Sequence, residues 1–262
     1  MTPSNQGSKT IYTPIKPFVY FSPIEWIGRL LSHPGLEAEM DCSWTDMQNF
    51  CKSNPGLMHD IFNGDLLHNF KGPDGKHFSV DEGEGRYTFS LSVDFFNPLS
   101  NKQAGKKISV GLITLVCLNL PPHLRYQSEN MYLAGIIPGP NEPPATAINH
   151  FLRPIVDHFI AMWSPGICYS CTDGHRNGRL VQCAIVCIIC DLPAARKTTG
   201  FVSYSHNHFC AICDCTLKDN GYNDLDIGSW RWRTNIDCRQ SAKHYRRAGA
   251  EHGEEIVERT GV

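Results

Sequence analysis

The spacing of hydrophobic residues predicts helices in two parts of the chain. An apolar stripe with helical period begins after Ser22 and Pro23, two residues typical of a helix start, and ends before Pro34. A second short helix is expected over 36–50. The same period returns over 143–163, where one helix face carries Ile148, Leu152, Ile155, Phe159 and Met162.

Between and after these segments the pattern becomes extended. Residues 87–96 have strand composition with partial alternation, and 108–120 form a nearly continuous apolar run rich in β-branched residues. Residues 131–137 make a third extended run, and 180–190 make a fourth after the long helix. Several strands, a long helix and another buried strand predict a mixed α/β sheet.

The composition excludes several classes of protein. Of the 262 residues, 41% are hydrophobic and 19% charged, which excludes a largely disordered chain. An ordinary transmembrane helix needs an apolar run of about twenty residues, which the chain lacks, so we expect no membrane partner. The formal net charge of −2 excludes a strongly basic surface as a whole. The polar first ten residues do not resemble a signal peptide, and we expect an intracellular, non-secreted protein.

Twelve cysteines is a high number for this length. A secreted disulfide framework could account for them, but a reduced protein with a metal site fits better without a signal peptide or an N-glycosylation sequon. Cys210 and Cys213 have the C-x2-C spacing that lets two thiolates bind one Zn²⁺. We take Cys238 and His244 as the completing ligands. The alternatives are a set of free thiols, or other completing ligands among His206, His208 and Cys215.

Two further pairs of cysteines have the same C-x2-C spacing. Cys187 and Cys190 lie in an apolar strand, where residues three apart point to opposite faces, so we expect both to be core thiols. Cys168 and Cys171 lie in a loop. An alternative that stays open is a four-cysteine zinc site in which this loop pair binds the same ion as the 210–213 pair.

Two acidic residues occupy unusual places in the predicted strands. Asp94 lies inside an otherwise apolar run and Asp191 at the end of another. A carboxylate among buried strand residues is costly to ionise without a partner. Taken singly, either residue can equally well be a capping or salt-bridged aspartate at the end of a strand. Together, on neighbouring strands, two carboxylates can hold divalent cations and support phosphoryl transfer.

Aromatic and basic residues alternate near the C-terminus. Trp230, Arg231 and Arg233 are followed by Arg246 and Arg247. Such side chains contact phosphates and stack on bases, which makes these five residues candidates for nucleic-acid binding. The alternative is that these arginines belong to a solvent-exposed helix face, where their aliphatic stems lie along the surface and bind no ligand.

An ordered series of segments resembles the CACTA (En/Spm-like) DNA transposases, with the fungal branch the most similar. The series comprises 92–98 (SVDFFNP), 118–122 (LNLPP), 131–140 (MYLAGIIPGP) and 191–196 (DLPAAR), followed by the C-x2-C pair and the Trp/Arg segment. The likeness covers the chain from about residue 17 onward.

This resemblance implies an incomplete ribonuclease-H-like core that uses three acidic residues with Mg²⁺ (or Mn²⁺) to cut and join DNA. Asp94 matches the first acid and Asp191 best matches the second, while the third acid is expected beyond Val262. The Cys/His-rich segment matches an insertion that binds a structural Zn²⁺. The resemblance also implies a nuclear protein that binds transposon ends. We therefore expect a transposase fragment that is inactive by itself, and leave open whether this chain is an enzyme.

The predicted organisation has four parts: a disordered leader (1–16), an N-terminal helical extension (17–85), a partial ribonuclease-H-like core (86–200) and a Cys/His-rich insertion with a C-terminal helix (201–262). A second hypothesis is a non-catalytic, zinc-stabilised module that binds nucleic acid or protein. A third is a poorly folding remnant. A homo-oligomer is compatible with all of the sequence features.

Overall fold

The chain folds into two compact units. Our computed structural model describes residues 2–6, 9–13, 17–80, 83–99 and 108–262. Unit 1 comprises Met1–Glu142 and His150–Ile189, and unit 2 comprises Pro143–Asn149 and Cys190–Val262.

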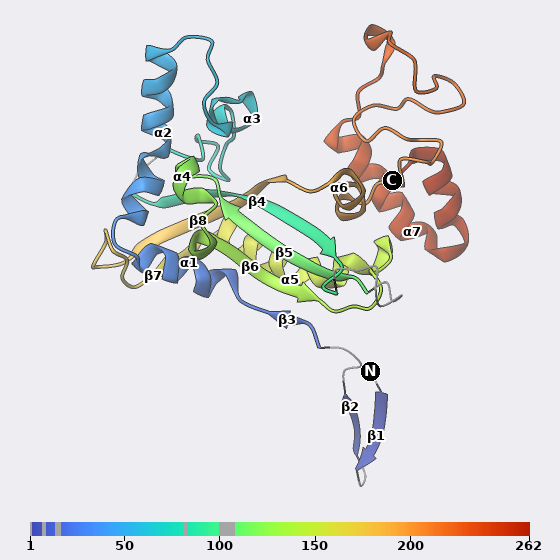
Figure 1. Ribbon diagram of the computed structural model, residues 1–262, viewed down its shortest axis with the longest axis horizontal. Helices are drawn as coiled ribbons and strands as arrows, with labels where there is room; N and C mark the ends of the chain where they lie inside the picture. Colours follow the sequence, from blue (N-terminus) through green and yellow to red (C-terminus); the bar gives the residue numbers. More distant parts are fainter. Residues whose placement is uncertain (1, 7–8, 14–16, 81–82, 100–107) are drawn as a thin grey trace. The chain divides into compact units, whose positions relative to one another are not determined.

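Unit 1 is built on a six-stranded mixed sheet (Figure 1). The strands lie in the order β3-β6-β5-β4-β8-β7, and all neighbours are antiparallel except β4 and β8, which are parallel. The mixed α/β sheet predicted from the strand pattern is thus confirmed. The strands are β3 (Val19–Tyr20), β4 (Gly85–Phe96), β5 (Val110–Cys117), β6 (Met131–Ile137), β7 (Ile167–Tyr169) and β8 (Arg179–Ile188).

Helices α1 (Pro23–Ser32) and α5 (Ala145–Trp163) pack on one face of this sheet. The ring of Phe89 on β4 lies 6.5 Å from Trp26 of α1 and 5.5 Å from Phe159 of α5. Ser22 occupies the N-cap position of α1 as predicted, but its side chain makes no capping hydrogen bond. The predicted apolar stripe of α5 is confirmed, because all five members are buried: Ile148, Leu152, Ile155, Phe159 and Met162.

The other face of the sheet is covered over the first part of β4. Met47, Phe62, Leu67 and Leu118 form a buried cluster there, with Val186 of β8 packed against it. Toward the end of β4 the same face is exposed. The covering elements are α2 (Leu36–Ser53), η1 (Ile61–Asn63) and α3 (Asp65–His68), and α4 (Pro122–Arg125) and η2 (Ser128–Asn130) connect β5 to β6.

A buried carboxylate fixes the start of α2 against the strand β8. Glu37 is 1% exposed and accepts hydrogen bonds from Thr172 Oγ1 (2.9 Å), Gly174 N (2.7 Å) and Arg179 Nη1 (2.9 Å). Its Oε1 also lies 3.0 Å from His175 Nδ1. Burial by itself raises the pKa of Glu37, but these hydrogen bonds outweigh it and hold the pKa below its ordinary value. Glu37 is therefore an ionised, fully paired group.

Unit 2 carries α6 (Leu192–Thr199), η3 (Ile227–Ser229) and α7 (Asn235–Thr260), with long loops between them. Thr234 caps α7 through a capping box with Asp237, and Gly249 interrupts the helix with a φ of 69°. Two buried or half-buried arginines, Arg196 and Arg233, hold the loops through hydrogen bonds to backbone carbonyls.

The N-terminal segment, predicted to be a disordered leader, contains a two-stranded antiparallel ladder. Strand β1 (Thr2–Gln6) pairs with β2 (Lys9–Thr13) in a sheet of its own. Residues 1, 7–8 and 14–16 of that segment lie outside the described residues. No helix among the residues that the structure describes is long and apolar enough to cross a membrane.

Candidate functional site

The two nominated acids belong to neighbouring parallel strands in different ways: Asp94 lies inside β4, and Asp191 follows β8. In the β4–β8 ladder Leu91 pairs with Ile188, and the Ile189 amide donates to the Leu91 carbonyl (2.9 Å). Asp94 lies three residues beyond Leu91 on β4, and Asp191 lies two residues beyond Ile189 along the chain. Asp94 belongs to unit 1, whereas Asp191 is the second residue of unit 2 after the end of β8.

The surroundings of the two acids differ from the sequence prediction in one respect. Asp94, expected among buried residues, is exposed because it lies on the open part of the sheet face, where its ladder partner Leu112 is only half-buried. The charge of Asp94 therefore has no burial cost to offset. Asp191 is also exposed and caps α6, since its Oδ1 accepts a hydrogen bond from Ala194 N at 2.8 Å.

The Cys210–Cys213 pair forms a knuckle. The amides of Ile212 and Cys213 point at Cys210 Sγ, at 3.4 and 3.3 Å. Burial raises the pKa of the Cys210 thiol, but hydrogen bonds from Cys213 and from these amides outweigh it and lower the pKa below its usual value. Burial and the hydrogen bond to Cys210 raise the pKa of Cys213 to about 12. Two cysteine sulfurs at this spacing are a donor pair of the kind that binds Zn²⁺.

Zinc binding itself and its completing ligands both remain predictions. Side-chain hydrogen bonds link Cys213 to both Cys210 and Cys215. Cys238 is half-buried in the first turn of α7, and His244 is exposed on the same helix. Within the described ranges, no group of three or more His, Cys, Asp or Glu side chains is arranged to hold a metal ion.

In the Trp/Arg segment (230–233), one arginine holds the loop structure through backbone carbonyls, while two other side chains are exposed to solvent. Arg233 Nε donates to the Cys213 carbonyl and its Nη1 to the Thr260 carbonyl, both at 2.7 Å, which ties the knuckle to the end of α7. Arg231 is 73% exposed at its side chain and lies 3.5 Å from Asp237. Trp232 is 54% exposed, while Trp230 is half-buried. Arg231 and Trp232 are thus the members of this segment available to a ligand.

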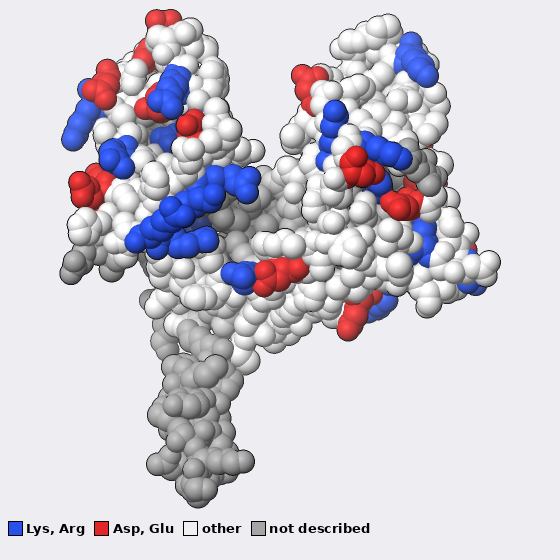
Figure 2. All heavy atoms as spheres, turned by 180° about the vertical axis from the view of Figure 1, so that it is seen from behind, with Lys and Arg blue, Asp and Glu red and all other residues white. Residues whose placement is uncertain are grey.

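Helix α7 presents basic side chains on one face. Arg239, Lys243, Arg246 and Arg247 are all exposed, and their spacing of four, three and one residues places them on the same side of the helix. Figure 2 shows Lys and Arg side chains gathered in a band on one face of unit 2. Although the whole chain is slightly acidic, unit 2 offers a local basic surface of the kind that binds phosphates.

Sequence reasoning missed Arg196, which organises the knuckle loop. Arg196 is 4% exposed, and its guanidinium donates to the carbonyls of Val202 (2.6 Å), His208 (3.3 Å) and Phe209 (2.6 Å). Its partners lie 6 to 13 residues along the chain in an irregular loop, so no periodic pattern marks them.

A comparison with protein-family models finds one that matches most of the chain. The model, described as transposase family tnp2, matches residues 67–246, which include both acids, the knuckle and most of the basic residues of α7. No curated protein matches the chain.

Proposed function

Because the chain belongs to the transposase family tnp2, we propose that it is the catalytic-core region of a CACTA-type DNA transposase of the fungal branch, with Asp94 and Asp191 as two of its metal-binding acids. Family membership supports transposition and DNA binding. The metal site, the ribonuclease-H-like core and the nuclear location rest on the resemblance of the individual segments.

The observation that carries this proposal is the parallel register of β4 and β8. Strands β4, β5 and β6 form an antiparallel meander, and the chain then passes through α5 before β8 pairs with β4. This order, with β4 in the middle, Asp94 near the end of β4 and Asp191 three residues after β8, supports a ribonuclease-H-like core. Parallel neighbours are what bring side chains from distant parts of the chain to one edge.

The acids present fit a divalent cation. Carboxylate oxygens are the ligands that Mg²⁺ and Mn²⁺ prefer, and both carboxylates are exposed. When bound, paired cations would stabilise the attacking and leaving oxygens of phosphodiester hydrolysis and strand transfer. Asp94 has the more rigid support, because it lies within the β4–β5 ladder. Asp191 retains Oδ2 for a cation while Oδ1 caps α6.

Replacing Asp94 with asparagine is expected to lower the affinity for Mn²⁺ by about tenfold or more, because an anionic ligand is lost at unchanged size. Asp191→Asn should have a similar effect, and since asparagine is as good an N-cap as aspartate, α6 keeps its start. Electron paramagnetic resonance of free Mn²⁺ measures the affinity. Asp157→Asn, on the exposed face of α5, is the matched control.

An unchanged Mn²⁺ affinity in both Asp94→Asn and Asp191→Asn would contradict the catalytic proposal. The chain would then be better described as a zinc-stabilised module that binds nucleic acid without cutting it. The knuckle geometry of Cys210 favours this second function, because it depends on unit 2 and not on the acids.

We further propose that α7 binds the DNA backbone. Replacing Arg246 and Arg247 with alanine is expected to reduce the slope of log Kd against log salt concentration by roughly two, because each lost phosphate contact removes about 0.9 from the slope. Fluorescence anisotropy with a labelled duplex of about 30 base pairs measures this. Arg153→Ala, an exposed arginine of unit 1, should leave the slope unchanged. Equal slopes for all three proteins would place the contact elsewhere.

A further inference from the structure

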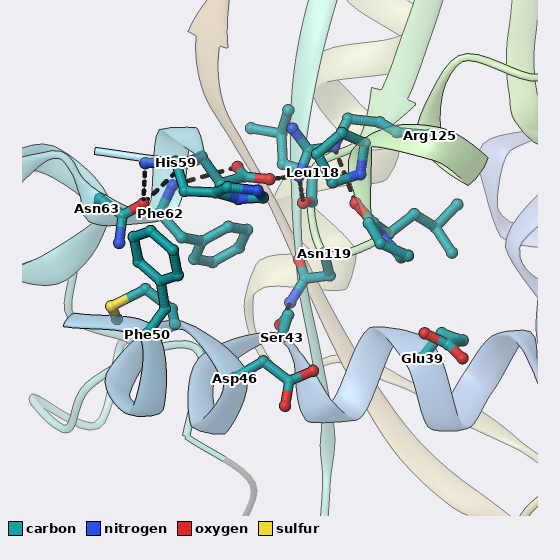
Figure 3. A pocket seen from close by; sticks show the side chains of 15 residues that line it. Glu39, Ser43, Asp46, Phe50, His59, Phe62, Asn63, Leu118, Asn119 and Arg125 are labelled. Carbon is teal, nitrogen blue, oxygen red and sulfur yellow. Dashed lines mark hydrogen bonds and ion pairs between the residues drawn. The ribbon is translucent and has the colours of Figure 1, made fainter. Parts of the chain in front are cut away.

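Unit 1 contains a pocket remote in sequence from both acids and from the knuckle. It encloses about 230 Å³ between α2, η1 and the chain that follows β5 (Figure 3). Ser43 of α2 points toward Asn119, Asp46 lies along the same helix, and Phe50 faces His59 across one end. The rings of Phe50 and His59 lie 5.0 Å apart.

The wall opposite α2 is held rigidly by a buried arginine. Arg125 is 5% exposed, and its Nε donates to the Leu120 carbonyl at 2.9 Å. Its Nη2 donates to Asp60 Oδ2 (2.7 Å) and to the Leu118 carbonyl (2.6 Å). Its Nη1 makes no hydrogen bond within the described part of the chain. A buried guanidinium with one unused amino group, in the lining of a preformed pocket, is a donor for a ligand oxygen.

The charge of the pocket selects the class of ligand. Three carboxylates and one guanidinium line it, and Asp60 is already paired with Arg125. Glu39 and Asp46 are exposed, and their side chains make no hydrogen bond or ion pair among the residues that the structure describes. This excess of negative charge disfavours a phosphate and favours a cation.

The pocket also has apolar surroundings. Phe50, Phe62, Pro121 and Pro122 contribute to its lining. Beside it, Leu57 (62%) and Met58 (76%), which precede η1, and Ile61 (38%), its first residue, are exposed. Several exposed large apolar residues in one short segment next to a pocket mark a surface that binds another protein.

We propose that this pocket binds a segment of a partner protein by taking up an arginine or lysine side chain. The cationic end pairs with Asp46 and Glu39, and its aliphatic stem packs between Phe50, Phe62 and the two prolines. A backbone carbonyl of the segment accepts a hydrogen bond from Arg125 Nη1, while apolar residues beside the cation cover Leu57 and Met58. This interaction is separate from DNA binding and from the metal site.

The test uses two labelled peptides that differ only in charge, acetyl-Gly-Leu-Arg-Leu-Gly and the same peptide with citrulline, the uncharged isostere of arginine. Titration of the whole chain by fluorescence anisotropy should show binding of the arginine peptide, weakened about tenfold or more for citrulline. The double variant Glu39→Gln, Asp46→Asn should lose the preference. Asp65→Asn, an exposed acid on α3 outside the pocket, should keep it.

Circular dichroism melting of each variant confirms that the fold is kept, which the exposure of Glu39 and Asp46 leads us to expect. Equal binding of the two peptides, or no binding of either at millimolar concentration, would overturn the proposal. Displacement of the arginine peptide from wild type by a short oligodeoxynucleotide, lost in the double variant, would assign the pocket to nucleic acid instead.

Discussion

Replacing Arg179 with leucine is expected to destabilise unit 1 by about 3–5 kcal/mol, the cost of breaking a buried ion pair from one side. The side chains of Arg179 and Glu37 are each 1% exposed. Arg179 Nη1 donates to Glu37 Oε1 (2.9 Å) and to Asp41 Oδ2 (2.7 Å). Leucine fills part of the space but removes the positive charge that pairs with the Glu37 carboxylate, which stays buried with Thr172, Gly174 and His175 as its remaining partners. Helix α2 therefore loses its main attachment to β8.

Hydrogen exchange followed by mass spectrometry measures this effect in unit 1 separately from unit 2, through the amides of α2 and β8. Arg153→Ala is the control, because the Arg153–Asp157 pair is exposed and is worth at most about 1 kcal/mol. Similar protection of α2 in Arg179→Leu and in the control would show that the Glu37 cluster is not what holds this helix.

Replacing Arg196 with methionine is expected to destabilise unit 2 by about 2–4 kcal/mol, because a buried charged donor is lost and its carbonyl partners stay buried. Burial lowers the pKa of Arg196, yet the guanidinium remains charged at neutral pH and binds three carbonyls. Methionine keeps the length of the stem, so the loss falls on the hydrogen bonds. The loop 201–215, which carries the knuckle, should open first.

Exchange rates of the amides in 201–215 report this change. Arg231→Met is the control, since that side chain is 73% exposed and should shift stability by less than about 1 kcal/mol. Protection of the loop that is equal in Arg196→Met and Arg231→Met would refute the structural role of Arg196. A further comparison of zinc uptake by the two variants would show whether the loop must be ordered to form the knuckle.

The secondary structure was largely predictable because it depends on local periodicity. The stripe of α5 repeats every three or four residues, and all its members are buried. The apolar runs that became β4, β5, β6 and β8 were located to within a few residues. The surroundings of Asp94 were not predictable, because an apolar run does not reveal that only the first part of β4 is covered on both faces.

The candidate site was predictable only in its composition. Asp94, Asp191 and the Cys210–Cys213 pair stand out by residue type and spacing. Arg233 was nominated for nucleic acid from its neighbours, but its guanidinium binds the carbonyls of Cys213 and Thr260, which lie 20 and 27 residues away. Local composition cannot separate an arginine that binds backbone carbonyls from one that meets solvent or phosphate.

The sequence by itself determined the long helices α1, α2 and α5, the four strands β4, β5, β6 and β8, and the candidate residues, because periodicity and spacing act over a few residues of chain. Only the tertiary structure decided which strands are neighbours and which charges are buried. The parallel pairing of β4 with β8 joins residues nearly a hundred positions apart, and Arg179 meets Glu37 across 142 positions. Such contacts depend on how the whole sheet closes over its core, and no local pattern encodes that choice.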